Sequence, residues 1–327
     1  SVPGLNPIMA AIRVGTCSWA DRTLLQSGWY PKEVRSPAAL LRYYSGVFST
    51  VEVDSTFYAF PDQARVFRWI ARTPPGFLFN VKVWGLFTYH DVPRASIPEK
   101  FRSKILETES DSVTLNDVPK DVRAEAWEMF TRLLEPLHQA GRMGYLLFQI
   151  PPGMKYSEQA LGYVRRVAEV TRPFRAAFEV RHRSWLEPGA ADRFLGTLRD
   201  GNLAYVIVDE PQLRWTVPPQ IHVTSRWGAV IRFHGRNRAA WQKTSVPVSE
   251  KFRYAYDVNE LSGWSESVRD LAGKTEQVFV MFNNCFRDYA VRNASTMRCL
   301  LGETCHDPSV LQGRLDFGSE TDGNDAP

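Results

Sequence analysis

Polar and charged side chains recur at every second position near the ends of several apolar segments of this chain. In TVEVDSTF (50–57), for example, valines alternate with Glu52 and Asp54. Successive side chains of a β-strand point to opposite faces, so each such segment would have one apolar face and one polar face. The polar faces predicted in this way carry Glu52, Asp54, Asn80, Lys82, Gln149, Glu179, Arg181, Asp209, Arg232 and His234.

The charged members of this set suit acid–base chemistry on an anionic substrate. Arginine and lysine bind phosphate or carboxylate groups, and the guanidinium fork does so with two parallel hydrogen bonds. We therefore expect Lys82, Arg181 and Arg232 to hold an anion. A carboxylate can act as a base, and histidine changes its charge near neutral pH. The candidate catalytic residues are Glu52, Glu179 and His234.

Other uses of the same residues remain open. Glu52 and Glu179 could face each other across an opening and serve as the carboxylate pair of a carbohydrate-active enzyme. A noncatalytic barrel could instead bind nucleic acid or another ligand through arginine and tryptophan side chains at its rim. The charges could also pair with one another and serve stability alone. A divalent metal ion is a further candidate, and its ligands would be His234, Asp209, Glu179 and Glu52.

Eight short apolar segments, rich in β-branched and aromatic residues, predict the strands. Helix-like segments separate most of them, and this repeat requires parallel strands because each helix returns the chain to the same end of the sheet. The strands span about 270 residues, close to the ~250 typical of a closed barrel. We therefore predict an α/β fold, a closed parallel (β/α)8 TIM-like barrel with the polar residues at its C-terminal mouth. The predicted strands are 12–19, 50–58, 78–85, 144–152, 175–182, 203–211, 229–236 and 277–284.

Helical periodicity and capping residues predict the helices. Within 62–72, Phe67, Ile70 and Ala71 recur at helical spacing, which predicts that they face the sheet, and Asp62 precedes them as an N-cap. The predicted helices are 37–48, 62–72, 121–141, 157–172, 189–201 and 265–273.

Two connections depart from the repeat. The sixth crossover, 212–228, contains Pro218 and Pro219 and is predicted to be extended chain rather than helix. The stretch 86–120 after the third strand is too long for an ordinary connection and predicts a lid or rim insertion. The predicted organisation is an N-terminal extension (1–11), one barrel domain (12–304) and an acidic, disordered tail (305–327).

Composition excludes several classes of protein. Hydrophobic residues make up 44% and charged residues 23% of the 327 positions, which is typical of a globular chain and not of disordered, collagen-like or coiled-coil proteins. The net charge of +4 is mild. Neither a GxGxxG nor a GxxxxGK[ST] motif is present, so no nucleotide cofactor is expected. No secretory signal or long apolar run occurs, which predicts a cytoplasmic protein with no membrane partner.

Several motifs together resemble the YecE-like family, also called domain of unknown function 72. They run in order from IRVGTCSW through FSTVEVDSTFYAFP, FQIPP, FEVRHRSW and RFHGR to FNNC. The resemblance implies a TIM-barrel-like fold and no established activity. Asp54 departs from it, because that family usually has Asn there. Residues that match both the motifs and the strand alternation are Glu52, Lys82, Gln149, Glu179, Arg181, Arg232, His234 and Asn284.

Trp19 and Trp185 follow the first and fifth strands, where their rings could stack on a sugar or a nucleobase. Taken together, these residues predict a hydrolase-like enzyme that acts on a phosphate-bearing substrate, such as a sugar phosphate or nucleic acid. The sequence leaves the metal and the oligomeric state open. The expected substrate-binding residues are Lys82, Gln149, Arg181, Arg232, Asn284, Trp19 and Trp185.

Overall fold

The computed structural model describes residues 11–105 and 110–303 of the chain. The predicted N-terminal extension and the predicted disordered tail lie outside these residues, apart from Ala11, which begins the first strand. Among the residues described, no helix combines the length and the apolar character needed to cross a bilayer.

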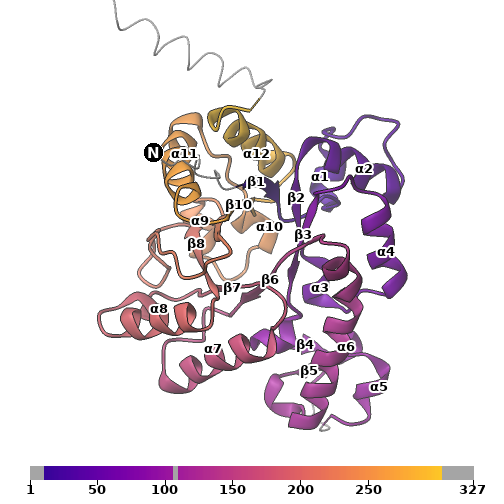
Figure 1. Ribbon diagram of the computed structural model, residues 1–327, viewed down its shortest axis with the longest axis vertical. Coiled ribbons are helices and arrows are strands. Elements are labelled where there is room, and N and C mark those ends of the chain that lie inside the picture. The colour runs from indigo at the N-terminus through magenta and orange to yellow at the C-terminus, as the bar shows by residue number, and fades with distance from the viewer. Residues whose placement is uncertain (1–10, 106–109, 304–327) are drawn as a thin grey trace, which may run out of the picture.

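Eight parallel strands form a closed ring, which confirms the predicted barrel. The first strand, β1, pairs with β2 on one side and with the last strand, β10, on the other, and this second pairing closes the sheet. Helices surround the ring of strands (Figure 1). The barrel strands are β1 (Ala11–Thr16), β2 (Thr50–Val53), β3 (Leu78–Lys82), β6 (Met143–Gln149), β7 (Ala176–Glu179), β8 (Ala204–Asp209), β9 (Ala229–Phe233) and β10 (Gln277–Phe282).

The predicted helices are all present, and one begins earlier than predicted. The last of them, α11, starts at Val258 rather than at residue 265, because Asp257 and Glu260 form a capping box there. The longer helices are α2 (Pro37–Val47), α4 (Gln63–Ala71), α6 (Lys120–Gln139), α7 (Glu158–Val170), α8 (Ala190–Asp200), α11 (Val258–Ala272) and α12 (Tyr289–Leu300). Short helices and 3-10 turns are α1 (Arg22–Gln26), α3 (Ser55–Tyr58), α9 (Arg238–Trp241), α10 (Val248–Lys251), η1 (Gly85–Thr88) and η4 (Arg183–Leu186).

Helix α4 has the predicted N-cap but a different buried face. The Asp62 side chain accepts a hydrogen bond from the backbone N–H three residues later, at 2.6 Å. Val66 and Trp69 are buried, whereas Phe67 is 53% exposed and Ala71 is exposed too, so the prediction that these two face the sheet is wrong. Ile70 is half-buried against the core. Two sets of residues recur at helical spacing along this helix. The set that contains Trp69 faces the sheet because the Trp69 indole stacks on Phe79 of β3, with ring centroids 5.8 Å apart.

The crossover between β8 and β9 contains no helix, as its two prolines predict. Side chains hold its extended backbone instead. The Glu210 carboxylate accepts a hydrogen bond from the Val217 N–H at 2.8 Å, and the Thr216 hydroxyl donates to the Pro211 carbonyl at 2.7 Å. These contacts replace the backbone hydrogen bonds that a helix would supply, and they place Glu210 at the mouth of the barrel.

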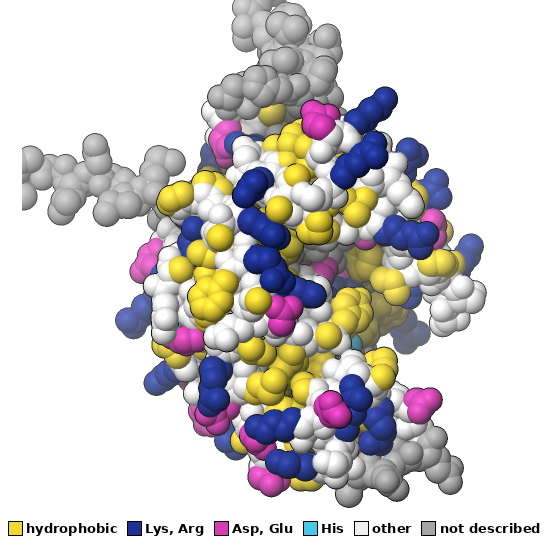
Figure 2. All heavy atoms as spheres, turned by 90° about the vertical axis from the view of Figure 1, so that its right-hand side faces the viewer, with side chains coloured by type: hydrophobic (Ala, Val, Ile, Leu, Met, Phe, Trp, Pro, Cys, Tyr) yellow, Lys and Arg dark blue, Asp and Glu magenta, His cyan; other side chains and the backbone are white. Residues whose placement is uncertain are grey.

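The insertion after β3 folds back on itself beside the barrel. Two short strands, β4 (Val92–Pro93) and β5 (Ser112–Val113), pair antiparallel. Short helical turns complete its described part: η2 (Arg94–Ser96), α5 (Glu99–Arg102) and η3 (Leu115–Asp117). Figure 2 shows the insertion as a lobe at the lower right, with a hollow between it and the rest of the molecule. The insertion therefore forms one wall of the barrel rim.

Candidate functional site

The guanidinium of Arg232 lies at the centre of a buried cluster of charges inside the barrel. Its Nε and Nη2 donate to the two carboxylate oxygens of Glu52, at 3.1 and 2.5 Å. Its Nη1 donates to Glu179 at 2.6 Å and, less closely, to Gln149 at 3.4 Å. Arg232, Glu52 and Glu179 are fully buried. Because an unpaired buried charge is costly, each of the three stabilises the others.

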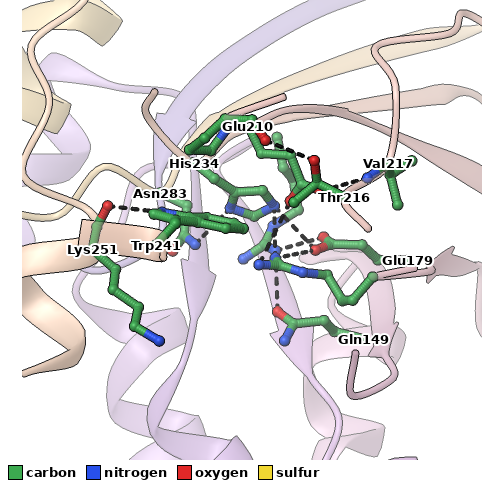
Figure 3. A network of polar contacts seen from close by, with 12 residues as sticks. Gln149, Glu179, Glu210, Thr216, Val217, His234, Trp241, Lys251 and Asn283 are labelled. Atoms are coloured by element: carbon green, nitrogen blue, oxygen red, sulfur yellow. Dashed lines mark hydrogen bonds and ion pairs between the residues drawn. The ribbon is translucent and has the colours of Figure 1, made fainter. Parts of the chain in front are cut away.

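Glu179 connects this cluster to a second guanidinium. Its Oε1 accepts a hydrogen bond from Arg181 Nη1 at 2.9 Å and lies 3.0 Å from His234 Nε2. Figure 3 shows Gln149, Glu179 and His234 pointing toward one region from different strands. The structure therefore brings together six of the predicted site residues: Glu52, Gln149, Glu179, Arg181, Arg232 and His234.

His234 is held through both of its ring nitrogens. Nδ1 lies 2.9 Å from the amide nitrogen of Asn283, and Nε2 lies 3.0 Å from Glu179. Nε2 also lies 3.1 Å from Arg181 Nη1. Since a carboxylate can only accept and a guanidinium can only donate, the contacts of Nε2 are compatible with either neutral tautomer. Burial lowers the pKa of His234 to about 3, despite the opposing effect of Glu179. The imidazole is therefore neutral at physiological pH.

The end of β8 has the opposite orientation to the one predicted. Asp209 is predicted to face the mouth, but its carboxylate points outward, toward the helices. It accepts hydrogen bonds from the Trp264 indole on α11 at 2.9 Å and from Arg236 at 2.6 Å. In the sheet Asp209 is the neighbour of Phe233, which packs on the same Trp264. Neighbours in register on parallel strands share a face, so Asp209 cannot belong to the mouth.

Glu210 takes the inward position that the prediction gives to Asp209. Its Oε2 lies 3.6 Å from Arg181 Nη2, and its Oε1 accepts the N–H of Val217. Glu210 is 2% exposed, and its Oε2 has no hydrogen-bond partner. Figure 3 shows Glu210 and Val217 on the side of His234 that faces the extended crossover. The mouth therefore contains a buried carboxyl group, one oxygen of which accepts no hydrogen bond and faces Arg181.

Lys82 and His90 form the part of the mouth nearest the insertion. The Lys82 ammonium lies 3.9 Å from Asp54 Oδ1 and 4.6 Å from the centre of the Phe57 ring. The His90 ring packs edge-on against the same phenyl ring, with centroids 4.9 Å apart. Burial, together with the charges of Lys82 and Arg181, lowers the pKa of His90 to about 4. A neutral imidazole thus lies close to two cations.

Three of the predicted substrate-binding residues lie away from this cluster. Trp185 is fully buried, and its indole N–H donates to the Met154 carbonyl at 2.9 Å. Trp19 packs edge-on against Trp69 outside the barrel, with centroids 6.1 Å apart. The amide of Asn284 donates to the Tyr254 carbonyl at 2.8 Å. Each of these side chains is engaged in packing or in holding a loop.

Two residues that the sequence analysis did not select, Asn283 and Trp241, contact members of the cluster. Asn283 contacts His234, and the Trp241 ring lies 5.1 Å from the Arg181 guanidinium. Asn283 could have been found by extending the strand alternation one residue past Phe282, whose ring stacks on the outward-facing Phe233. No local pattern predicts Trp241, because it lies in a short helix far along the chain.

The region of this chain that matches known proteins includes nearly all of the barrel. A family model described as "Protein of unknown function DUF72" matches residues 13–314. The chain belongs to the DUF72 family. The UPF0759 protein YunF of Bacillus subtilis is 27% identical over 294 residues, which cover 89% of this chain and 94% of YunF.

Solved DUF72 structures share the fold. A DUF72 family protein of Thermotoga maritima is 29% identical, with a TM-score of 0.71 over 90% of this chain and all of that one. A DUF72 family protein of Enterococcus faecalis is 24% identical, with a TM-score of 0.74 over 90% of this chain and 96% of that one. These likenesses establish the TIM-barrel-like fold of the DUF72 chain and assign it no reaction.

The carboxyl groups at the mouth of this DUF72 barrel differ in proton affinity. Burial raises the pKa of Glu210 to about 7, although Arg181 opposes the rise. Burial likewise raises the pKa of Glu52 to about 7 against the effect of Arg232. Burial also acts to raise the pKa of Glu179, but Arg232, His234 and Arg181 together outweigh it and hold that pKa well below its usual range. Glu179 is therefore a permanent anion.

The hypothetical metal ligands do not form a metal site in the part of the chain that the structure describes. Among residues 11–105 and 110–303, no group of three or more His, Cys, Asp and Glu is arranged to hold a metal ion. Asp209 points outward, and both carboxylates of the inner cluster are already bonded to Arg232. What the mouth offers instead is two cations, a neutral imidazole and a carboxyl group that can carry a proton near neutral pH.

Proposed function

We propose that this DUF72 protein is a hydrolase-like enzyme that binds a phosphate-bearing substrate, such as a sugar phosphate or nucleic acid, at the C-terminal mouth of the barrel. The observation that carries the proposal is the environment of Lys82. In the described part of the chain its ammonium forms one ion pair, with Asp54 at 3.9 Å, and the guanidinium of Arg181 acts on the same neighbour, His90. A cation that its own protein neutralises only partly, as here at Lys82, is suited to an anionic ligand.

Glu210 is the residue best suited to move a proton. A carboxyl group with a pKa of about 7 is half protonated at neutral pH, which is the condition for efficient general acid–base catalysis. In hydrolysis of a phosphate ester, water adds to phosphorus and the ester P–O bond breaks. Glu210 would give its proton to the departing oxygen, and the proton that the attacking water loses would pass to solvent, from which Glu210 is protonated again.

The predicted catalytic roles change accordingly. Glu179 is held as an anion by three partners, and His234 is neutral with a pKa of about 3. Both suit a positioning role, in which Glu179 orients Arg181 and His234 supports Glu179 from the side opposite Arg232. Glu52 is shielded by its two hydrogen bonds to Arg232. Lys82 and Arg181, whose side chains are partly exposed, are therefore the groups that we expect to meet substrate, and the buried Glu210 beside Arg181 is the proton carrier.

The carbohydrate alternative has less support. Glu52 and Glu179 bind the same guanidinium, that of Arg232, and all three are fully buried. A glycosidase needs open space between its two carboxyl groups for the glycosidic bond and for water or the sugar ring. Here an arginine fills that space, which supports a structural role for the inner cluster.

Phosphate binding and turnover test the proposal separately. Calorimetric titration with inorganic phosphate should show binding that K82Q weakens about tenfold, a loss of about 1.4 kcal/mol. K274Q, at the other end of the barrel, is the matched control and should bind as the parent does. A panel of phosphate monoesters and diesters, assayed by released phosphate or alcohol, should include a substrate whose turnover E210Q abolishes. If no ester is turned over and K82Q binds phosphate as well as K274Q does, the proposal is wrong.

A further inference from the structure

A groove on the outside of the barrel, between α2 and α4, is lined by four arginines. Its volume is about 730 Å³. Arg35 lies just before α2, while Arg65, Arg68 and Arg72 follow one another along α4. Figure 2 looks onto the side of the molecule that carries these two helices and shows basic side chains gathered along it. This groove is separate from the mouth, since none of its lining residues belongs to the buried charge cluster.

The protein neutralises little of this charge. Asp62 lies 3.6 Å from Arg65 and 3.7 Å from Arg68. Arg35 donates to the backbone carbonyl of Lys32, a contact that leaves its charge uncompensated. In the described part of the chain, neither Arg35 nor Arg72 forms an ion pair. Four guanidinium groups therefore face a single carboxylate.

The floor of the groove is apolar. Leu25 projects into it and is 45% exposed, and Leu40 and the half-buried Trp19 line it beside Trp69. The groove therefore combines a basic and an apolar lining. A ligand that suits the groove must therefore bring several anionic groups together with flat or apolar surfaces.

We propose that the α2–α4 groove binds single-stranded nucleic acid. Proteins bind single strands by a basic groove that follows the phosphates and by side chains on which the bases stack. An α-helix rises 1.5 Å per residue, so Arg65, Arg68 and Arg72 form a row with steps of about 4.5 and 6 Å along α4. Such a row can contact successive phosphates, while the bases turn toward Trp19 and Leu25.

Other polyanions fit the groove less well. A duplex offers the apolar floor none of its base faces, because its bases pair and stack inside, whereas a single strand can turn its bases toward the floor. Polyphosphate has no apolar face to cover Leu25. An acidic peptide could satisfy both the charges and the floor, and it is the competing occupant that an experiment must distinguish.

The test is fluorescence anisotropy of a labelled oligothymidylate with the full-length protein. Each neutralised phosphate contributes about 0.7 to the slope of log K against log salt for a single strand. The variant R65Q/R68Q/R72Q should therefore lower that slope by about 2 and weaken binding at least about tenfold at low salt. The variant R165Q/R166Q/R199Q removes three exposed arginines from α7 and α8, and it should bind as the parent does.

Several outcomes would overturn the proposal. Equal binding by the two triple variants would remove the groove as the site. Loss of binding in K82Q, with full binding in R65Q/R68Q/R72Q, would place the oligonucleotide at the mouth. A labelled polyglutamate peptide that binds as tightly as the oligonucleotide, and that the α4 variant weakens equally, would assign the groove to acidic proteins. Because the inference rests on the groove alone, failure of phosphate hydrolysis at the mouth would leave it standing.

Discussion

Replacing Glu210 with glutamine should make the protein more resistant to unfolding at alkaline pH while removing its activity. The carboxyl group is 2% exposed, and burial raises its pKa from 4.5 to about 7. A raised pKa means that the folded state holds the proton more tightly than the unfolded state does. Stability therefore falls as the pH rises from about 4.5 to about 7, and the loss is complete above that window.

The magnitude follows from the difference between the two pKa values. That difference is about 2.5 pH units, and each unit is worth about 1.4 kcal/mol, so ionisation of Glu210 costs the folded state about 3 kcal/mol. Glutamine keeps the acceptor for the Val217 N–H but cannot ionise. Relative to the parent, E210Q should therefore gain about 3 kcal/mol between about pH 4 and about pH 8.

Urea denaturation at about pH 4 and about pH 8 measures the difference in the free energy of unfolding between E210Q and the parent. Comparing the E210Q–parent difference at both values cancels any pH-independent effect of the amide, and also the contribution of Glu52, which is common to both proteins. E187Q, which removes an exposed carboxylate, is the control for the loss of one charge. A change of less than about 1 kcal/mol between the two pH values would refute the view that burial dominates at Glu210.

Three further predictions concern the barrel interior. R232M should lower the free energy of unfolding, measured by chemical denaturation, by about 3–5 kcal/mol because it leaves two buried carboxylates without their partner. A loss below about 1 kcal/mol would contradict that pairing. G15A should lower the melting temperature, since its Cβ would lie 2.1 Å from the Thr50 carbonyl oxygen and well-packed sites resist added volume. The control is G153A, which should leave the melting temperature nearly unchanged because nothing lies within 4 Å of the added Cβ. The ring protons of His234, assigned by NMR with H234Q, should show no titration at neutral pH because the pKa is about 3, and a midpoint near 6 or 7 would show that the ring is less buried or differently paired.

Local sequence patterns predicted the barrel and most of the inner cluster. Strand and helix periods differ, so the eight strands and the helices between them could be distinguished without any tertiary information. Where one face of a strand was clearly apolar, as at Val51 and Val53 around Glu52, the alternation also predicted which side chains would meet inside. The prolines of the sixth crossover predicted its extended form for an equally local reason, because proline cannot continue a helix.

The same reasoning failed where both faces of a strand are apolar. In AYVIVDE (204–210) either set of alternate residues could face inward, so the pattern could not decide between Asp209 and Glu210. The register with β9 decided it, because Asp209 lies beside the outward-facing Phe233. Surface helices posed a similar choice at α4, where packing against Phe79 selected the stripe that contains Trp69 rather than the one with Phe67.

What the sequence alone determined was which residue types lie at the ends of the strands; what only the tertiary structure decided was how they pair and which remain free. Arg232 binds Glu52, which is 180 positions away in the chain, and this pairing commits the two charges that looked most available for chemistry. Glu210 and Lys82 became the better candidates because their neighbours leave them only partly satisfied. The physical reason is that burial and Coulomb interactions depend on distances in space, and these are set by closure of the barrel rather than by any local spacing.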